Sequence, residues 1–535
     1  MSSNVQIIIT MAAYIAVIIG ISFYYMKRSN ENTENYYLGG RGLGTWVTAM
    51  SAEASDMSGW LLMGLPGVAY WYGVSDAAWT AIGLALGTYL NWLIVSKRLR
   101  RYSVVAGNSI TLPDFFNNRF KDDKKIILFI AAIFILVFFA VYAGSCFVVG
   151  GKLFNTLFGL DYKMMMIISA VFVIIYTLIG GFLAESLSDM VQGFIMFAML
   201  IIVLVAGVVA AGGPTAIIEN LKDIPGFTEF FGIASPVMDD VSGLQAIENN
   251  APVFGPAGAY GVLTIISTMA WGLGYFGMPQ VLLRFMAIRK INELKRSRRI
   301  AVVWVVISLA AAVIIGLVGR ALYPVAHGTS SAAENIFIST AVDLLPPVIA
   351  GLAMAGILAA SMSSSDSYLL IATSAVSKNL LQGIFKKDAT DRQIMVAGRI
   401  TLLILAVVGI LIALDENSVI FKIVSFAWAG FGATFGPLML FSLFWKRTTK
   451  TGAIAGMLIG AATVFIWKLA VRPFAVAHDL PALNIYELLP AFIISCIAIV
   501  IFSLATKAPS QEIQDEFEIA KDNSVVLDAE ESMAQ

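Results

Sequence analysis

The residues of this sequence best suited to chemistry lie in the stretch 51–67, which reads SAEASDMSGWLLMGLPG. This stretch lies within an apolar run over residues 46–72, long enough to cross a bilayer at about 20 residues per span. It nevertheless contains Asp56, and an ionised carboxylate at membrane depth costs at least ~2.5–3.5 kcal/mol, so such a residue usually has a function. Three glycines and Pro66 interrupt the helix, and broken backbone is tolerated there only around a protein-lined or wet cavity. We therefore predict an ion and substrate site; the alternative is that Asp56 is a packing residue at a kink.

A second interrupted apolar run follows five spans later and reads WGLGYFGMP over residues 271–279. An odd number of crossings separates corresponding points of the two runs, so they have opposite orientations in the membrane. Glycine- or proline-interrupted spans at corresponding positions of two halves indicate the site of a secondary transporter built from inverted repeats. The alternative is a glycine-rich packing face beside a proline kink.

The ninth span carries a run of hydroxyl residues, GILAASMSSSDS over residues 356–367. Ala360, Ser363, Ser364 and Ser367 recur at spacings of three and four and therefore share one face of a helix. Hydroxyl oxygens opposite unwound backbone carbonyls provide the oxygen ligands that a small hard cation such as sodium needs. A packing seam of small residues is the alternative.

The sixth span begins with three polar residues on one face, Glu185, Asp189 and Gln192. They fall at its cytoplasmic end. Solvation, or pairing with Arg and Lys of the loops, is therefore as good an interpretation as a role in transport.

The composition is that of a polytopic membrane protein: 59% of the 535 residues are hydrophobic and 13% are charged, against about 25% charged in soluble proteins. Cys146 and Cys496 lie in apolar runs far apart, so no disulfide framework is expected. His327 and His478 lie in predicted loops, so no zinc-type cluster is indicated. The sequence contains no Walker-type glycine loop, which argues against transport driven directly by ATP hydrolysis.

Hydropathy predicts about thirteen membrane spans, of which the first is a retained span and not a signal peptide. The expected spans are 6–26, 46–72, 79–96, 126–149, 164–179, 188–211, 260–286, 300–322, 348–376, 395–414, 419–445, 452–467 and 488–505.

The basic residues predict the orientation. Most of the 35 Lys and Arg residues fall in alternate loops, on the same side as the C-terminal tail. Positive residues favour the cytoplasmic side, so we expect the N-terminus outside and the C-terminus inside.

These spans divide the chain into six parts. The loop over 212–259 is external and should contain short helices, and the acidic tail should be a solvated cytoplasmic segment. The expected parts are a first span with its cytoplasmic loop (1–45), a first inverted repeat of spans two to six (46–211), the external loop (212–259), a second repeat of spans seven to eleven (260–446), two further spans (447–506) and the tail (507–535).

Several motifs together resemble the sodium/solute symporter family, and within it the bacterial branch that transports proline. They lie at 37–44, 54–67, 112–116, 179–183, 271–279 and 427–437. The resemblance implies an all-α integral membrane protein with the LeuT-type inverted five-helix repeat, spans two to six against spans seven to eleven.

The same resemblance implies a sodium site. Its ligands would be the backbone carbonyls of Ala54, Met57 and Ala360 and the hydroxyls of Ser363 and Ser364. Many relatives have Ser-Thr where this sequence has Ser363-Ser364. Serine and threonine both carry a hydroxyl group, so the second hydroxyl ligand is kept.

Two carboxylates would take part in sodium coupling by the same resemblance. Asp56 matches the aspartate that these symporters need, although it need not be a ligand. Asp189 follows Leu187-Ser188 where the family usually has Trp-Thr, and Glu185 replaces an apolar residue. These departures argue against a second sodium site at Asp189.

The resemblance also implies a substrate, L-proline, imported with co-transported sodium across the cell membrane by alternating access. The aromatic faces of Trp271 and Tyr275 could pack on the proline ring, with cation–π contact worth ~0.5–2 kcal/mol. The expected partners are L-proline, sodium and membrane lipid, with no nucleic acid and no obligatory protein partner. The implied substrate residues are Ser58, Gly59, Trp60, Tyr142, Trp271, Tyr275 and Pro279.

Other functions remain as alternatives. The coupling ion could be a proton, or the solute another small molecule. A membrane-embedded enzyme would need a nucleophile–base pair or a metal cluster at membrane depth, and the spans contain no histidine to supply one. A sensor would need a separate partner, because the tail is too short for a catalytic module.

Overall fold

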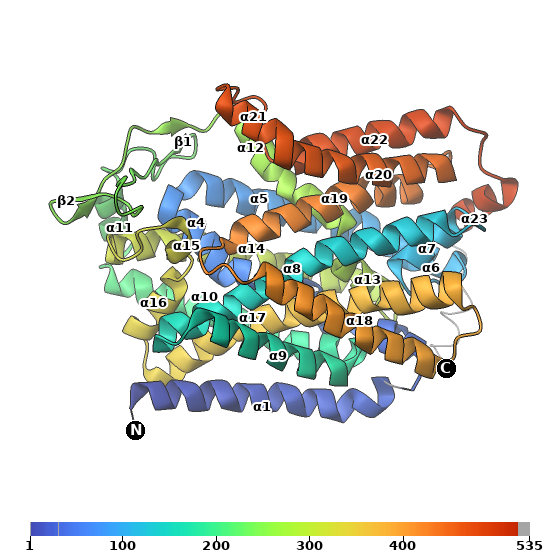
Figure 1. Cartoon of the computed structure of the whole chain (residues 1–535), viewed down its shortest axis with the longest axis horizontal. Helices are drawn as coiled ribbons and strands as arrows, with labels where there is room; N and C mark the ends of the chain where they lie inside the picture. The colour runs from blue at the N-terminus through green and yellow to red at the C-terminus, as the bar shows by residue number, and fades with distance from the viewer. Residues whose placement is uncertain (1, 30, 523–535) are drawn as a thin grey trace.

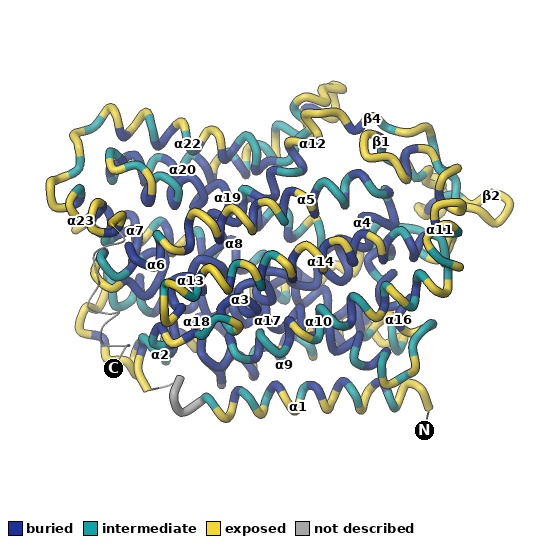
Figure 2. Tube along the Cα trace, turned by 180° about the vertical axis from the view of Figure 1, so that it is seen from behind, coloured by how far each residue is buried: buried dark blue, intermediate teal, exposed yellow. Residues whose placement is uncertain are grey.

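The computed structural model describes residues 2–29 and 31–522, and its helices run side by side along the long axis of the molecule (Figure 1). Helix α1 (Ser3–Ser29) lies along one edge and packs against α10 (Phe182–Ala210) and α17 (Pro347–Ser374). Helices α20 (Lys450–Ile466) and α22 (Leu488–Leu504) pack together along the opposite edge. Helix α17 has apolar and small residues on every face and is buried on nearly all of them, so it forms the centre of the bundle (Figure 2).

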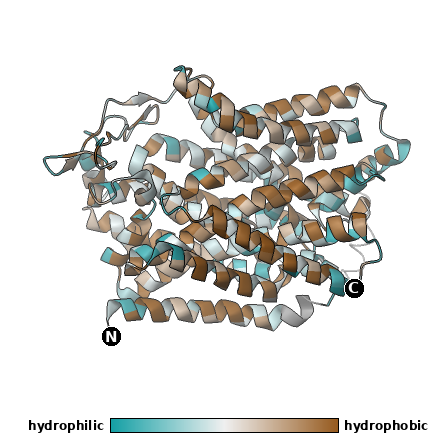
Figure 3. Cartoon of the chain, in the orientation of Figure 1, coloured by the Kyte–Doolittle hydropathy of each residue, from teal (hydrophilic) through white to brown (hydrophobic). Residues whose placement is uncertain are grey.

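The outer surface of the bundle is apolar. Outward side chains such as Leu411 and Leu504 are about 60% exposed, and polar residues gather at the two ends of the bundle (Figure 3). Within the described residues, nine helices are long and apolar enough to cross a membrane, or ten if one bent pair counts as a span. Apolar side chains exposed around such helices fit a lipid surround.

The predicted number of thirteen spans is not confirmed by this count. Of the remaining expected spans, two correspond to shorter apolar helices, Tyr162–Leu178 and Leu488–Leu504. A third corresponds to the interrupted segment around Asp56, which is no single helix. The number therefore stays a prediction.

The region of the expected first repeat contains ten elements between residues 45 and 210. They are α3 (Thr45–Ala54), η2 (Trp60–Gly64), α4 (Leu65–Tyr72), α5 (Val74–Leu90), η3 (Asn91–Val95), α6 (Ser96–Val105), α7 (Leu112–Arg119), α8 (Ile126–Phe158), α9 (Tyr162–Gly180) and α10.

The region of the expected second repeat begins with another interrupted segment and ends with a long helix. Its elements are α12 (Val262–Met269), η4 (Ala270–Gly277), α13 (Pro279–Ala287), η5 (Ile291–Glu293), α14 (Leu294–Leu322), α15 (Ser330–Ala333), α16 (Ile336–Leu344), α17, η6 (Ala375–Phe385), α18 (Asp391–Ile412) and α19 (Ile420–Phe444).

Both predicted interruptions are present. Helix α3 ends at Ala54, and the chain resumes as a π-helical turn, η2, before α4 begins with Pro66 in its first turn. Helix α12 continues as a 3₁₀ turn, η4, and the path then bends by 43° into α13. Pro279 occupies the first turn of α13, where a backbone N–H would have no helical partner.

Helix α5 and the turn η4 touch backbone to backbone. A Cβ atom added to Gly87 would lie 2.2 Å from the carbonyl oxygen of Gly272, and one added to Gly272 would lie 2.2 Å from that of Gly83. Glycine is therefore required on both sides of this contact, which holds η4 against the first half of the bundle.

The loop over 212–259, which is expected to be external, differs in part from the prediction. It contains the expected short helix, α11 (Pro214–Leu221), but also four two-residue strands. These pair antiparallel as β1 (Gly232–Ile233) with β4 (Gly258–Ala259), and β2 (Ile247–Glu248) with β3 (Ala251–Pro252). The turn between β2 and β3 is Asn249-Asn250, both at positive φ. Asparagine tolerates that conformation in hairpin turns, so this dipeptide was the available signal.

The prediction of a solvated tail holds only in part for residues 511–521, of which six are exposed and three are buried. Residues 511–521 form α23 (Gln511–Lys521), whose Phe517 is only 4% exposed. The guanidinium groups of Arg98 and Arg119 lie 4.8 and 5.5 Å from the Phe517 ring. Lys121 pairs with Glu516 at 2.5 Å. The acidic helix thus docks on a basic surface of α6 and α7, while residues 523–535 lie outside the described residues.

A buried ion pair joins α8 to the loop before α16. Lys152 lies 2.6 Å from Glu334, and their side chains are 5% and 1% exposed. Glu334 also accepts the backbone N–H groups of Ile420 and Phe421 at 3.0 and 3.1 Å. These two residues open α19, so Glu334 satisfies N–H groups that have no partner within that helix.

Replacing Lys152 with Met should destabilise the protein by ~3 kcal/mol, because the Glu334 carboxylate would remain buried without its cation. The matched control is Lys222→Met. Lys222 also lies 2.6 Å from a glutamate, Glu219, but these side chains are 49% and 61% exposed, so its loss should cost below about 1 kcal/mol. The unfolding temperature in detergent measures both. Equal shifts of the unfolding temperature would show that burial does not determine how much an ion pair stabilises the protein.

Candidate functional site

The end of helix α3 and the middle of α17 meet at the first interruption. The hydroxyl of Ser363 donates to the carbonyl oxygen of Ala54 at 2.8 Å, and that of Ser364 approaches the same oxygen at 3.4 Å. Ser363 also lies 3.4 Å from the carbonyl oxygen of Ala360. All four residues are buried. Two carbonyl and two hydroxyl oxygens are thus gathered where the helix breaks, which is a set of ligands for a small hard cation.

Met57, the fifth expected ligand, lies three residues further along the same broken segment. It is buried, and its N–H donates to the carbonyl oxygen of Glu53 at 2.8 Å. The hydrogen bonds of Ser363 and Ser364 do not reach it. The contacts therefore bring together four of the five expected ligands.

Asp56 joins the two interrupted segments. Its carboxylate accepts the hydroxyl of Tyr275 at 2.8 Å and the side-chain amide of Gln280 at 3.3 Å. The indole N–H of Trp60 donates to the Asp56 backbone carbonyl at 3.2 Å. Sequence reasoning missed Gln280, although it directly follows Pro279 at the start of α13. Asp56 thus bridges α3 and the η4–α13 segment.

Aromatic rings surround the predicted substrate residue Trp271. The Trp60 ring lies 6.4 Å from it, centroid to centroid, and Tyr486 stacks on it at 5.2 Å. The indole N–H of Trp428 donates to the Trp271 carbonyl at 2.8 Å, and its ring meets Tyr275 edge-on at 5.1 Å. Trp428 and Tyr486 were not among the predicted residues, and Trp428 falls in the motif at 427–437.

Three further predicted substrate residues, Tyr142, Gly59 and Ser58, lie on α8 and on the turn that follows α3. Tyr142 stacks on Tyr368 of α17 at 4.3 Å. Gly59 faces α8 closely, because a Cβ there would lie 2.1 Å from Val149. Ser58 is buried in the same turn.

A cavity of about 840 Å³ opens at the end of the molecule that carries α12 and α21 (Arg472–Ala477). Trp271 lines it together with Tyr486 and Phe421. The other predicted substrate residues do not line it, and each of them is buried. The aromatic cluster therefore lies between this cavity and the buried residues around Asp56.

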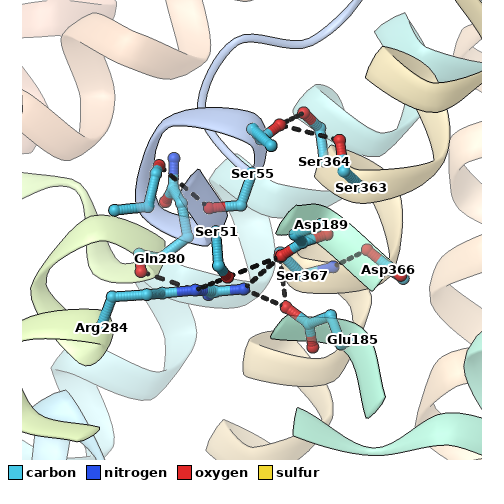
Figure 4. Close-up of polar contacts among 12 residues, drawn as sticks. Ser51, Ser55, Glu185, Asp189, Gln280, Arg284, Ser363, Ser364, Asp366 and Ser367 are labelled. Carbon is cyan, nitrogen blue, oxygen red and sulfur yellow. Dashed lines mark hydrogen bonds and ion pairs between the residues drawn. The ribbon is translucent and has the colours of Figure 1, made fainter. Parts of the chain in front are cut away.

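A buried charge cluster around Arg284 of α13 lies below Ser363 and Ser364 in Figure 4. Its guanidinium group pairs with Glu185 and, at 3.1 Å, with Asp189. It also donates to Ser51 at 2.9 Å and to Ser367 at 2.9 Å. The cluster joins α3, α10, α13 and α17.

This cluster changes three expectations. Arg284 stands at the end of the expected span 260–286, close to the basic residues of the following loop, but it is a fully buried residue of α13. Ser367 contacts Glu185 and Arg284 instead of the α3 break, so the hydroxyl face of α17 serves two different sites. Gln192 does not join its helical neighbours, because its amide donates to Tyr14 of α1 at 3.0 Å.

The Oδ2 oxygen of Asp189 already has two hydrogen-bond donors within the protein. That atom accepts the Ser51 hydroxyl at 2.8 Å as well as the Arg284 guanidinium. The carboxylates on the polar face of the sixth span thus pair with an arginine, but this arginine belongs to a helix and not to a loop as expected.

Comparison with known proteins gives concordant results. The model of the sodium:solute symporter family matches residues 36–460. The high-affinity proline transporter PutP of Bacillus subtilis is 43% identical over 495 residues, which are 92% of this chain and 97% of the relative. The sodium/proline symporter of Escherichia coli is 40% identical over 521 residues, 97% of this chain and 96% of the relative.

The fold is also found among solved structures. A Na⁺-coupled sialic acid symporter, solved in a substrate-bound outward-open state, matches with a TM-score of 0.74 and 17% identity. The match covers 95% of this chain and 99% of that one. The likeness confirms the expected class, an all-α membrane protein with the LeuT-type fold. The family model covers most of the chain, and the chain therefore belongs to the sodium:solute symporter family.

Proposed function

We propose that this protein imports L-proline together with sodium across the cytoplasmic membrane by alternating access. The observation that carries the proposal is the meeting of the Ser363 and Ser364 hydroxyls with the Ala54 carbonyl at the break of α3. Family membership makes the protein a transporter rather than an enzyme. The two relatives named above, a proline transporter and a sodium/proline symporter, support proline as the solute and sodium as the coupling ion.

Sodium, as cargo, would bind between α3 and α17. The ligands would be the carbonyls of Ala54, Met57 and Ala360 and the hydroxyls of Ser363 and Ser364. The two hydroxyl hydrogens that now point at Ala54 would turn away, so that both oxygens and the carbonyl face the cation. Oxygen ligands of this kind can hold sodium without a carboxylate in the first coordination sphere.

The carboxylates Asp56 and Asp189 would couple the site to the rest of the bundle. Asp56 would act through Tyr275 and Gln280, which connect the two interrupted segments. Asp189 would act through Ser51 and Arg284, which tie α3 to α10 and α13. Both would respond to sodium because α3 carries the carbonyl of Ala54.

Proline would bind beside the breaks, next to the aromatic cluster. Trp271 and Tyr275 would pack on its ring, and free N–H groups at the start of the half-helices would hold its carboxylate. The broken segments would supply the rest of the pocket. The proposed substrate residues are Ser58, Gly59, Trp60, Tyr142, Trp271, Tyr275 and Pro279.

The proposed orientation places the basic end of the molecule, with α6 and α23, in the cytoplasm, and the N-terminus outside. Moving one charge inward then gains ~2.3 kcal/mol per 100 mV of membrane potential.

Coupling is reciprocal, so sodium should tighten proline binding by the same factor as proline tightens sodium binding. The two proposed inverted repeats, 46–211 and 260–446, would each contribute one interrupted segment to the site. Membrane lipid is part of this arrangement, and no obligatory protein partner is proposed.

Uptake of radiolabelled proline into proteoliposomes tests the proposal. An inward sodium gradient should raise the initial rate at least tenfold over equal concentrations of choline or potassium, and an inside-negative potential should raise it further. Equal rates in choline would contradict sodium coupling, and drive by a pH gradient alone would favour a proton. If another small solute displaces labelled proline at much lower concentration, proline is not the main substrate.

A further inference from the structure

A second cavity, of about 700 Å³, lies at the basic end of the molecule, between the η3–α6 segment and the start of α14. No carboxylate lies among the described residues that line it. Its charged lining residues are Lys97, Arg101, Arg289, Lys290, Lys295 and Arg298.

Three of these cations have partners within the protein. Arg101 donates to the carbonyl oxygens of Ala520 and Asp522. Arg289 pairs with Glu293 at 2.9 Å. The guanidinium of Arg298 lies 5.7 Å from the ring of Tyr89.

The other three cations have none. The ammonium groups of Lys97, Lys290 and Lys295 make no ion pair or hydrogen bond with any residue of 2–29 or 31–522, and all three residues are exposed. Three unpaired positive charges around one hollow create a local potential that attracts an anion.

The wall of this cavity is apolar on one side. Trp92, Leu93 and Leu294 line it. Leu93 is 41% exposed, and the neighbouring Ile94 is 39% exposed on the outer surface of the same helical segment. Tyr89, one turn earlier, is 42% exposed. The cavity is therefore basic toward the end of the bundle and apolar where it adjoins the lipid-facing surface.

We propose that this cavity binds the headgroup of an anionic phospholipid, such as phosphatidylglycerol. Lys97, Lys290 and Lys295 would contact the phosphate oxygens, and the acyl chains would follow Leu93 and Ile94. Basic pockets between membrane helices, close to the headgroup level, bind anionic headgroups in this way. A free phosphate ion would use the cations but not the apolar wall.

Trp92 places this cavity close to the ion site. Its indole N–H donates to the Glu53 carboxylate at 3.0 Å, and Glu53 directly precedes Ala54 in α3. Only one hydrogen-bonded pair therefore separates the lipid cavity from the helix end that supplies the Ala54 carbonyl. The proposal itself does not depend on which solute is transported.

Native mass spectrometry of the full chain in detergent, titrated with phosphatidylglycerol or phosphatidylcholine, tests the proposal. The triple variant Lys97→Gln/Lys290→Gln/Lys295→Gln should bind phosphatidylglycerol at least tenfold more weakly than wild type, because each basic residue at such a surface contributes to anionic lipid binding. The control Lys124→Gln/Lys386→Gln/Lys387→Gln removes the same charge from exposed lysines outside the cavity and should bind like wild type. Phosphatidylcholine should bind weakly to all three, and 10 mM inorganic phosphate should not displace phosphatidylglycerol.

Equal affinity of the triple variant and wild type would overturn the proposal. Displacement by inorganic phosphate would identify a plain anion site instead. The acidic residues Asp528, Glu530 and Glu531 are another source of negative charge, and α23 ends beside Arg101. If a chain ending at Asp522 bound phosphatidylglycerol tenfold more tightly than the full chain, the tail would be the natural occupant and the proposal would be wrong.

Discussion

Sodium-driven proline uptake should require a much higher sodium concentration when Ser363 and Ser364 are both replaced by alanine. Each hydroxyl oxygen lies within 3.4 Å of the Ala54 carbonyl. If each contributes ~1.4 kcal/mol to sodium binding, the double variant should need roughly 100-fold more sodium for half-maximal uptake. Initial rates of labelled proline uptake against sodium concentration measure this shift.

Ser365→Ala is the matched control. Ser365 is equally buried on the same helix, but its hydroxyl donates to the carbonyl of Ser361 in its own helix at 2.6 Å. The variant should keep the sodium dependence of wild type. Full activity of the double variant would rule out these hydroxyls as ligands, and an equal loss in Ser365→Ala would indicate a packing effect.

Replacing Arg284 with Met should be the most destabilising of the substitutions considered. Its guanidinium group is the only cation within hydrogen-bonding distance of Glu185 and Asp189 among the described residues. Without it, two carboxylates would remain buried and uncompensated, a change that costs ~3–5 kcal/mol for a single buried pair. The unfolding temperature and the monodisperse fraction after heating in detergent measure the loss.

Two further variants separate charge from packing. Arg289→Met removes an arginine that pairs with Glu293 at 2.9 Å but whose side chain is 53% exposed, so its cost should stay below about 1 kcal/mol. Combining Arg284→Met with Glu185→Gln and Asp189→Asn removes the carboxylate charges and should recover part of the stability. If Arg284→Met is as stable as wild type, the cluster does not carry a buried charge pair.

The two interrupted segments could be predicted because their signals are local. Glycine and proline within an apolar run indicate broken helix wherever the run lies, and Asp56 at membrane depth indicates a functional site. The serine spacing around Ser363 similarly predicts one face of a helix. These patterns predicted which segments form the candidate site. The resemblance to the symporter family implied the pairing of Ser363 with Ala54, and the structure contains this contact.

The partners of the buried charges could not be predicted in the same way. Arg284 stands at the end of an apolar run, shortly before a cluster of basic residues. This sequence position is equally typical of an arginine in a loop. Its partners Glu185 and Asp189 are almost a hundred residues earlier in the chain, and the packing of both α10 and α13 against α3 brings them together. Nothing in the local pattern distinguishes a paired arginine from a solvated one.

The docking of α23 was missed for a related reason. Its acidic composition is typical of a solvated segment. What holds it is a surface of other residues, with Lys121 for its carboxylates and Arg98 and Arg119 around Phe517. A single phenylalanine among acidic residues was the available signal.

The glycine contact between α5 and η4 has a mechanical consequence. Most helices in a bundle are separated by side chains, which can change rotamer and let one element slide past another. Between Gly87 and Gly272 no side chain intervenes. The two backbones are therefore in direct contact, and no side chain can change rotamer to let α5 and η4 slide past each other. A motion that exposes the site first to one side of the membrane and then to the other must carry α5 and η4 as one rigid piece, and its hinges must lie outside that piece.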